Sequence, residues 1–187
     1  LTESKIDQYL ALVLPNQAML STEQCCAIRE FVRHGGGVVA TFESSLYDES
    51  GKRRQDFGLT DVFGAESVTR DAVGPIRDAS LRIEDHSHLG IGLEGTEFVA
   101  NGGDLYHVPV QVHDDASAVL TMIPPVPRMP PERSFFHVPR TTTALAVLND
   151  FVEGRSVYFP CDIARWCRPG GPGNPDHRVL LGNAIRY

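Results

Sequence analysis

The chain has 187 residues, which suits one sizeable domain better than two, since domains typically hold roughly 100 to 200 residues. Its 42% hydrophobic and 22% charged residues are ordinary for a globular protein and exclude a collagen-like, coiled-coil or disordered chain. The formal net charge is −7 and the only basic run, KRR at 52–54, is short, so a nucleic-acid partner is not expected.

The N-terminal sequence predicts a strand followed by a helix. Residues 9–16, YLALVLPN, form a Leu- and Val-rich run stopped by proline, which is typical of a fully buried strand. Ser21, with Gln24 three residues later, matches a capping box, so a helix should begin here and end at the glycines from Gly35. Its apolar residues recur at spacings of three and four, which gives the helix one buried face. They are Cys25, Ile28, Phe31 and Val32.

Residues 37–42, GVVATF, predict a second buried strand. Two strands joined by one helix through short connections form a βαβ unit, in which the strands are parallel and the crossover is right-handed in nearly all cases. This unit indicates the α/β class. The polar stretch that follows predicts an exposed loop and then a short helix near residues 59–63.

The second half of the chain is richer in predicted strands, which are separated by Gly, Asp and Asn. They are SLRIED (80–85), TEFVAN (96–101), YHVPVQVH (106–113) and SAVLTMI (117–123). Residues 123–140 contain six prolines and predict a loop, whose central aromatic residues Phe135 and Phe136 are candidate interface residues. The segments around FVEG (151–154) predict a hairpin, and Pro175 suits the start of a last helix.

Together these elements predict one α/β domain over residues 1–187. The expected architecture is a flavodoxin-like three-layer sandwich with a mostly parallel sheet and an antiparallel extension in the second half. No apolar stretch approaches the roughly 20 residues needed to cross a bilayer, so a membrane partner is not expected. Four cysteines without a C-x-x-C pair suit free thiols in a reducing compartment, which predicts a cytoplasmic location.

In an open parallel sheet, ligands collect at the carboxyl ends of the strands. This rule predicts a crevice at Asn16, at residues 42–45 and at residues 160–162. A nucleophile elbow needs Ser or Cys on the tight turn after the strand, with a His nearby as base. Phe42 and Glu43 occupy that turn and cannot serve, while Ser44 and Ser45 come one or two residues late. The sequence therefore predicts an elbow without a nucleophile.

Three segments carry a resemblance to a known family, and one of them is specific: GGGVVATFESSLYDESGKRRQDFGLTDVFG, at 35–64. The others are YLALVLPN at 9–16 and PDHRVLLGNA at 175–184. The chain resembles the domain that follows the barrel in glycoside hydrolases related to family 42, the β-galactosidase trimerisation domain. That domain is similar to the class I glutamine amidotransferase fold. Cys161 departs from the family pattern, which usually has Trp before Asp162.

The resemblance implies a non-catalytic accessory and oligomerisation domain, with the amidotransferase nucleophile lost at Phe42 or Glu43. It further implies that the chain is a fragment of a longer glycoside hydrolase, whose catalytic carboxylates lie in an upstream barrel. The implied partners are this barrel and copies of the chain, as a homotrimer or other homo-oligomer. His177 would be a relic of the amidotransferase histidine or a structural residue, with the structural role favoured. No cofactor is implied.

Other functions stay open from the residues. Carboxylates at the crevice could form a glycosidase pair, or the loop 46–54 could reach the sugar pocket of a neighbouring subunit. The candidate carboxylates are Glu43, Asp48, Glu49 and Asp162. The chain could instead be an amidotransferase-like hydrolase using Ser44 or a cysteine, or a carbohydrate-binding module using the crevice near Glu43 and Asp162. The histidines around His86 do not fix a third ligand by their spacing, so no metal is expected.

Overall fold

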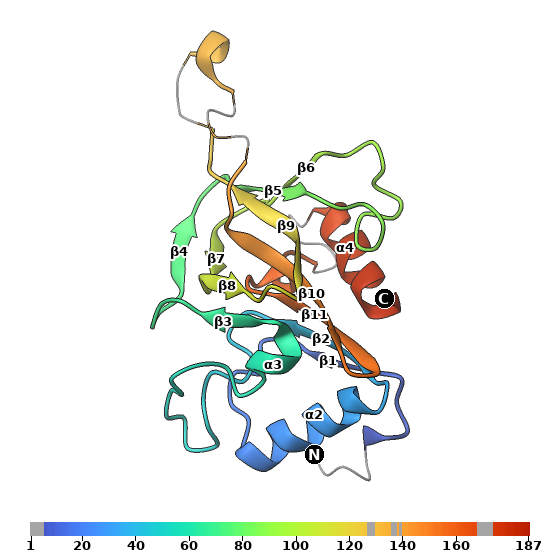
Figure 1. Cartoon of the computed structure of the whole chain (residues 1–187). Coiled ribbons are helices and arrows are strands. Elements are labelled where there is room, and N and C mark those ends of the chain that lie inside the picture. Colours follow the sequence, from blue (N-terminus) through green and yellow to red (C-terminus); the bar gives the residue numbers. More distant parts are fainter. Residues whose placement is uncertain (1–5, 127–129, 136–137, 139, 168–173) are drawn as a thin grey trace.

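The computed structural model describes residues 6–126, 130–135, 138, 140–167 and 174–187 (Figure 1). The helices in this part of the chain are α2 (Thr22–Arg33), α3 (Thr60–Phe63) and α4 (Pro175–Arg186), with short 3₁₀ turns at Pro131–Arg133 and Ile163–Trp166. The main sheet consists of β1 (Ala11–Leu14), β2 (Gly37–Thr41), β5 (Ser80–Ile83), β6 (Phe98–Ala100), β9 (Ser117–Ile123), β10 (Ala144–Phe151) and β11 (Gly154–Phe159). Two small sheets pair β3 (Ala65–Ser67) with β8 (Val110–Val112) and β4 (Val73–Ile76) with β7 (Leu105–His107).

The main sheet is mixed, with the strand order β1-β2-β11-β10-β9-β5-β6. β2 pairs in parallel with both β1 and β11. The pairings from β11 through β10, β9 and β5 to β6 are antiparallel. The α/β class and the antiparallel extension are therefore confirmed, but the extension is the larger part of the sheet. The parallel part is confined to the three strands that surround the predicted βαβ unit.

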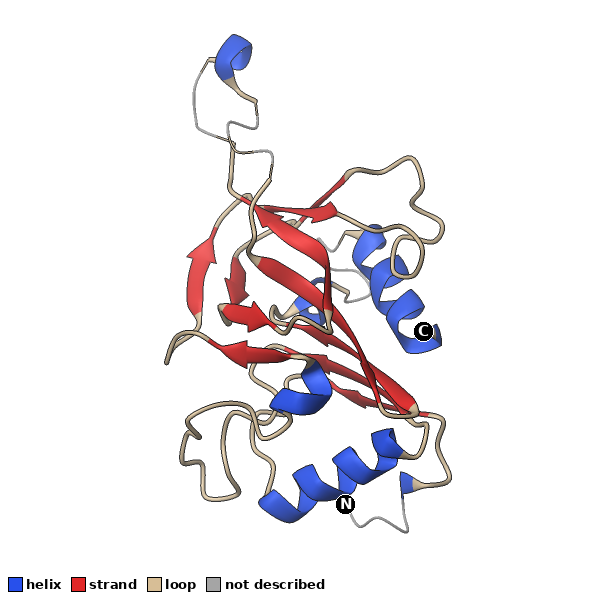
Figure 2. Cartoon of the chain, in the orientation of Figure 1, coloured by secondary structure: helices blue, strands red, loops and turns tan. Residues whose placement is uncertain are grey.

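Helices cover both faces of this sheet, as the three-layer prediction requires. Figure 2 shows α2 and α3 on one side of the strands and α4 on the other. Alternation along the strands separates two cores: Val38 and Tyr158 pack with α2 and α3, whereas Val39 and Phe159 pack with α4. The residues of the βαβ unit thus build the centre of the molecule.

The strand β1 corrects the expectation of a fully buried segment at residues 9–16. Because β1 is the edge of the sheet, its neighbour Leu10 is 93% exposed and Val13 is 43% exposed. A Leu- and Val-rich run indicates a strand, but it does not tell whether a second strand covers each side.

The helix α2 begins as the sequence predicts. Ser21 is its N-cap, with the Gln24 backbone N–H donating to the Ser21 hydroxyl and the Gln24 side chain accepting from the Ser21 N–H. Two backbone donors that the helix itself cannot satisfy are thereby paired. The predicted apolar face, which includes Ile28 and Phe31, is buried.

The predicted hairpin and last helix are confirmed. β10 and β11 pair from Val147 with Tyr158 to Phe151 with Gly154, so only two residues form the turn. Asn174 caps α4, and Pro175 occupies its first turn. The described residues of the proline-rich stretch between β9 and β10 form an arm that projects from the body of the molecule (Figure 1). They are 124–126, 130–135, 138 and 140–143. Phe135 is 57% exposed on this arm, and Phe136 lies outside the described residues.

The four cysteines are free thiols, with Cys25 and Cys161 buried, Cys26 exposed and Cys167 half-buried. Within the described parts of the chain, no helix has the length and apolar character that crossing a membrane requires.

Candidate functional site

A sharp bend follows β2, where the sequence predicts an elbow. Phe42 has a φ of 53°, in the left-handed region that an aromatic residue rarely adopts and that costs about 1 kcal/mol. Its N–H donates to the Phe159 carbonyl over 2.7 Å, and its own carbonyl accepts from the Tyr158 hydroxyl over 2.6 Å. Bonds to β11 on both sides of Phe42 therefore hold the bend in place.

The serines that follow the bend, Ser44 and Ser45, are buried inside the fold. The Ser44 hydroxyl is fully buried, lies 2.7 Å from the Thr41 carbonyl oxygen and 3.0 Å from that of Leu14, and accepts from the Gln17 N–H over 3.1 Å. Ser45 is fully buried as well, and its hydroxyl has no hydrogen-bond partner among the described residues. Both hydroxyls are thus withdrawn from solvent. Ser44 connects β1, β2 and the loop between β1 and α2.

A cavity of about 220 Å³ opens beside the bend. Its lining residues come from the elbow, from β7 with the residue before it, and from the segment after β11. They are Phe42, Asp104, Leu105, Tyr106, Asp162 and Arg165. β7 reaches this place through backbone contacts: His107 forms a β-bridge with Cys161, and the Val108 N–H donates to the Pro160 carbonyl. The cavity therefore combines two aromatic rings, two carboxylates and a guanidinium.

The charges at the cavity are partly balanced. Burial raises the pKa of the Asp162 carboxyl, and the nearby Arg165 guanidinium opposes this shift. Asp104 forms an ion pair with Arg77 over 3.3 Å, and Arg165 lies 5.9 Å from the centre of the Tyr106 ring. Such a mixture of aromatic faces and hydrogen-bonding groups can hold a small polar ligand such as a sugar ring.

The structure brings only some of the predicted crevice residues together. Phe42 and Asp162 line the cavity. Asn16 and Glu43 lie next to each other at the bend, where the Asn16 side-chain oxygen accepts from the Glu43 N–H over 3.3 Å, but neither lines the cavity. Asp48 binds the backbone N–H groups of Ser50 and Lys52 in its own turn. A carboxylate pair of Glu43 or Asp48 with Asp162 is therefore not formed at this cavity.

His177 lies in the first turn of α4 and is fully buried. Neither ring nitrogen makes a well-formed hydrogen bond to a described residue. Burial lowers the pKa of His177, and the Asp176 carboxylate and the Ala100 backbone offset this shift only in part. His177 does not line the cavity beside Phe42, so the structure does not place it as a base at the elbow.

The cysteines offer no replacement nucleophile at the bend. Burial raises the pKa of the Cys161 thiol to about 12, which keeps it protonated at neutral pH. Its Sγ lies 3.8 Å from the Leu145 carbonyl, inside the core. Within the described ranges, no group of three or more His, Cys, Asp or Glu side chains is arranged to hold a metal ion.

Two buried histidines predict an acid-sensitive fold. Burial lowers the pKa values of both His107 and His177 below the 6.5 of an ordinary histidine, so the unfolded chain binds more protons as the pH falls through 6.5. Their contribution to stability is complete above this pH and is lost below it. We expect the free energy of unfolding to fall as the pH is lowered from 6.5, with an upper limit of about 1.4 kcal/mol per histidine for each pH unit.

Urea denaturation followed by circular dichroism at several pH values measures this slope. His177→Gln should make it shallower, whereas His34→Gln, at an exposed position, should leave it unchanged. Aspartates and glutamates with lowered pKa values, such as Asp48 and Asp85, act below about pH 4.5 and do not enter this window. An equal slope in both variants would contradict the assignment to buried histidines.

The fold is similar to one part of much larger solved structures. No family model matches the chain. The fold is similar to that of the β-galactosidase from Bacillus circulans sp. alkalophilus, with a TM-score of 0.67, 15% identity, and coverage of 97% of this chain and 23% of that one. It is also similar to that of a catalytic mutant of Gan42B, a GH42 β-galactosidase from G. stearothermophilus, with a TM-score of 0.63, 19% identity, and coverage of 97% and 21%.

A third similar structure is smaller. A ThuA-like protein from Bacteroides uniformis gives a TM-score of 0.64 at 12% identity, with coverage of 99% of this chain and 71% of that one. ThuA-like proteins have the amidotransferase-like fold, so the fold predicted from the resemblance is confirmed. The chain spans less than a quarter of the length of the two β-galactosidases.

Proposed function

We propose that the chain is a non-catalytic accessory and oligomerisation domain of a glycoside hydrolase. One observation carries the non-catalytic part: the strained bend after β2 holds Phe42, while Ser44 behind it is fully buried and bonded to the backbone. A bend of this kind suits a serine or cysteine nucleophile, but no hydroxyl or thiol is exposed on residues 42–45. An amidotransferase-like hydrolase is accordingly a weaker hypothesis than a non-catalytic accessory domain.

The assembly part of the proposal is supported by the arm and by the similar structures. In GH42 β-galactosidases, the same fold is one part of a chain several times longer. The described part of the arm projects from the body and carries an exposed aromatic side chain, Phe135. Aromatic residues on a segment restrained by prolines bury area at a low entropic cost. We therefore assign the arm to contacts with further copies of the chain, in a homotrimer or other homo-oligomer. The proposed second partner is an upstream barrel, and the proposed compartment is the cytoplasm.

Light scattering coupled to size exclusion tests this assembly. The 187-residue chain should give a mass of two or more copies, and about three times the single-chain 20.5 kDa for the trimer. Phe135→Asp should shift the mass towards that of one chain. Val152→Asp is the matched control, because Val152 is 68% exposed at the tip of the β10–β11 hairpin, away from the arm (Figure 1). A single-chain mass at every concentration would refute the assembly.

A second candidate function is carbohydrate binding at the cavity beside Phe42. The observation that favours it is the joint lining by Phe42, Tyr106 and two carboxylates. Such groups can contact both the apolar face and the hydroxyl groups of a sugar. Calorimetric titration with galactose and lactose separates this function from a purely structural role, and the absence of heat with either sugar would remove it.

A further inference from the structure

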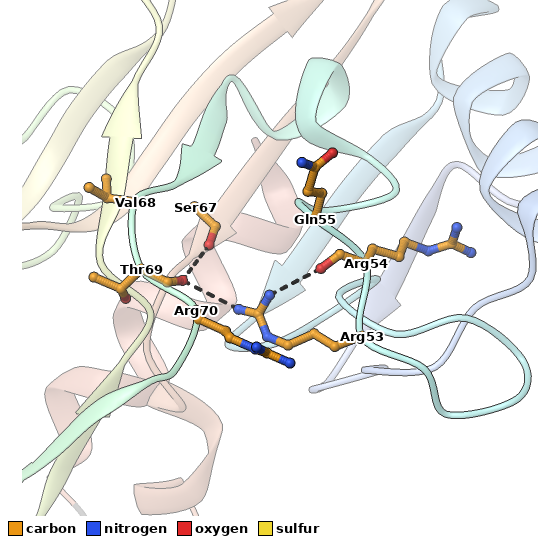
Figure 3. Close-up of a pocket in the computed structure, with 7 residues that line it drawn as sticks. All are labelled: Arg53, Arg54, Gln55, Ser67, Val68, Thr69 and Arg70. Carbon is orange, nitrogen blue, oxygen red and sulfur yellow. Dashed lines mark hydrogen bonds between the residues drawn. The ribbon is translucent and has the colours of Figure 1, made fainter.

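A second cavity lies apart from the bend and has a different chemistry. It has a volume of about 410 Å³, and it lies between the loop before α3 and the segment that follows β3 (Figure 3). Its lining residues are Arg53, Arg54, Gln55, Ser67, Val68, Thr69 and Arg70. Three of the seven are arginines and none is acidic, in a chain whose net charge is −7. Positive charge is therefore concentrated at this cavity.

Hydrogen bonds between side chains and backbone groups connect the two sides of this cavity. The Asp56 carboxylate accepts the Ser67 N–H over 2.9 Å and the Phe57 N–H over 2.7 Å. The Ser67 hydroxyl donates to the Thr69 carbonyl over 2.8 Å. These bonds fix the loop to the strand end, and both bonds to Asp56 fall on its Oδ1 atom.

The Arg53 side chain lies at the opening of the cavity, where two carbonyl groups contact it. Its guanidinium donates to the Arg54 carbonyl over 3.2 Å and makes a longer contact of 3.4 Å with the Thr69 carbonyl. Figure 3 shows the side chains of Arg53 and Arg70 extending towards each other from opposite sides of the cavity. The Arg54 guanidinium points away and donates to the Leu20 carbonyl over 2.7 Å. Arg53 and Arg70 are therefore the two charges that share the opening.

No Asp or Glu among the described residues forms an ion pair with Arg53 or Arg70. Two guanidinium groups that face each other repel, and this cost is offset when an anion lies between them. Guanidinium binds planar carboxylate and tetrahedral phosphate through paired N–H groups, which makes arginine the usual choice for such ligands.

From this geometry we propose that the cavity binds a small oxyanion, a phosphate or carboxylate group, between Arg53 and Arg70. Arg53 supplies a guanidinium fixed by two carbonyls, and the exposed Arg70 closes on the ligand from the other side. The site is independent of the bend and of the arm, and its function does not rest on the proposed assembly.

Nuclear magnetic resonance titration of the 15N-labelled 187-residue chain tests the proposal, with inorganic phosphate and sodium acetate as separate probes at constant ionic strength. We expect saturable shifts of the amides in residues 53–55 and 67–70. Tighter binding of phosphate or of acetate identifies the class of oxyanion. Arg53→Gln and Arg70→Gln should each weaken binding about tenfold, the value of one charge-assisted contact.

Lys52→Gln is the matched control, because it removes the same charge from an exposed neighbour that does not line the cavity. Arg70 is exposed, so its substitution leaves the fold intact and keeps the test valid if Arg53→Gln unfolds. The proposal is overturned if neither probe gives saturable shifts at these amides. Equal weakening by Lys52→Gln and Arg70→Gln overturns it as well, because it would indicate general attraction by positive charge.

Discussion

Replacement of Tyr158 with alanine should lower the free energy of unfolding by about 3–5 kcal/mol, which is a large part of the stability of a typical domain. Tyr158 is fully buried in β11 and stacks on Phe63 with a centroid separation of 4.5 Å and an interplanar angle of 7°. The Phe57 ring packs against it in a T-shaped arrangement, with a centroid separation of 5.1 Å. Removing the ring would leave a cavity between the sheet and α3 that neighbouring side chains cannot fill. Urea denaturation followed by circular dichroism gives the difference.

Tyr158→Phe is the matched variant, because it keeps the ring and removes only the hydroxyl. This hydroxyl donates to the Phe42 carbonyl over 2.6 Å, and its loss leaves that carbonyl with one bond fewer at a strained residue. We expect a smaller loss of about 1–3 kcal/mol, the usual cost of an unpaired buried group. Equal losses for the two variants would show that packing against Phe63 and Phe57 contributes little.

The sequence predicts those elements whose signals are local. The capping pair Ser21 and Gln24, together with the spacing of Ile28 and Phe31, defines α2 almost to the residue. Two apolar runs on either side of such a helix then imply parallel pairing, because the crossover between them is short. This reasoning is sufficient to place the bend at Phe42, since it depends only on neighbours along the chain.

Pairing between distant segments leaves a weaker trace in the sequence. The antiparallel strands β9, β5 and β6 join the sheet beyond β10, and their short apolar runs do not indicate an order. The exposure of Leu10 has the same origin, because nothing in the run itself shows that β1 is an edge. Burial of a strand is decided by what lies beside it, which depends on the whole topology.

The candidate sites show the same division. The sequence predicts that Phe42 and Asp162 lie close together, because both follow strands that end at the same edge of the sheet. Both do line one cavity. Tyr106 was missed because backbone bonds, such as that from Val108 to Pro160, bring β7 there, and backbone bonds leave no side-chain pattern. Likewise, the run at 52–54 is visible as basic in the sequence, but its approach to Arg70 follows from the fold.

Substitution of Gly154 should be the most damaging change at the other end of β11. A Cβ atom added here would overlap the carbonyl oxygens of Val32 and Gly36, which are backbone atoms at the end of α2 and at the start of β2. Because neither can move without separating the helix from the sheet, Gly154→Ala should cost about 3 kcal/mol and Gly154→Val more.

Gly95→Ala is the control, since nothing lies within 4 Å of its added Cβ and its effect should stay within about 0.5 kcal/mol. Thermal and urea denaturation of Gly154→Ala and Gly95→Ala measure the two losses of stability. Similar losses would mean that α2 and β11 do not lie as close together as this contact requires.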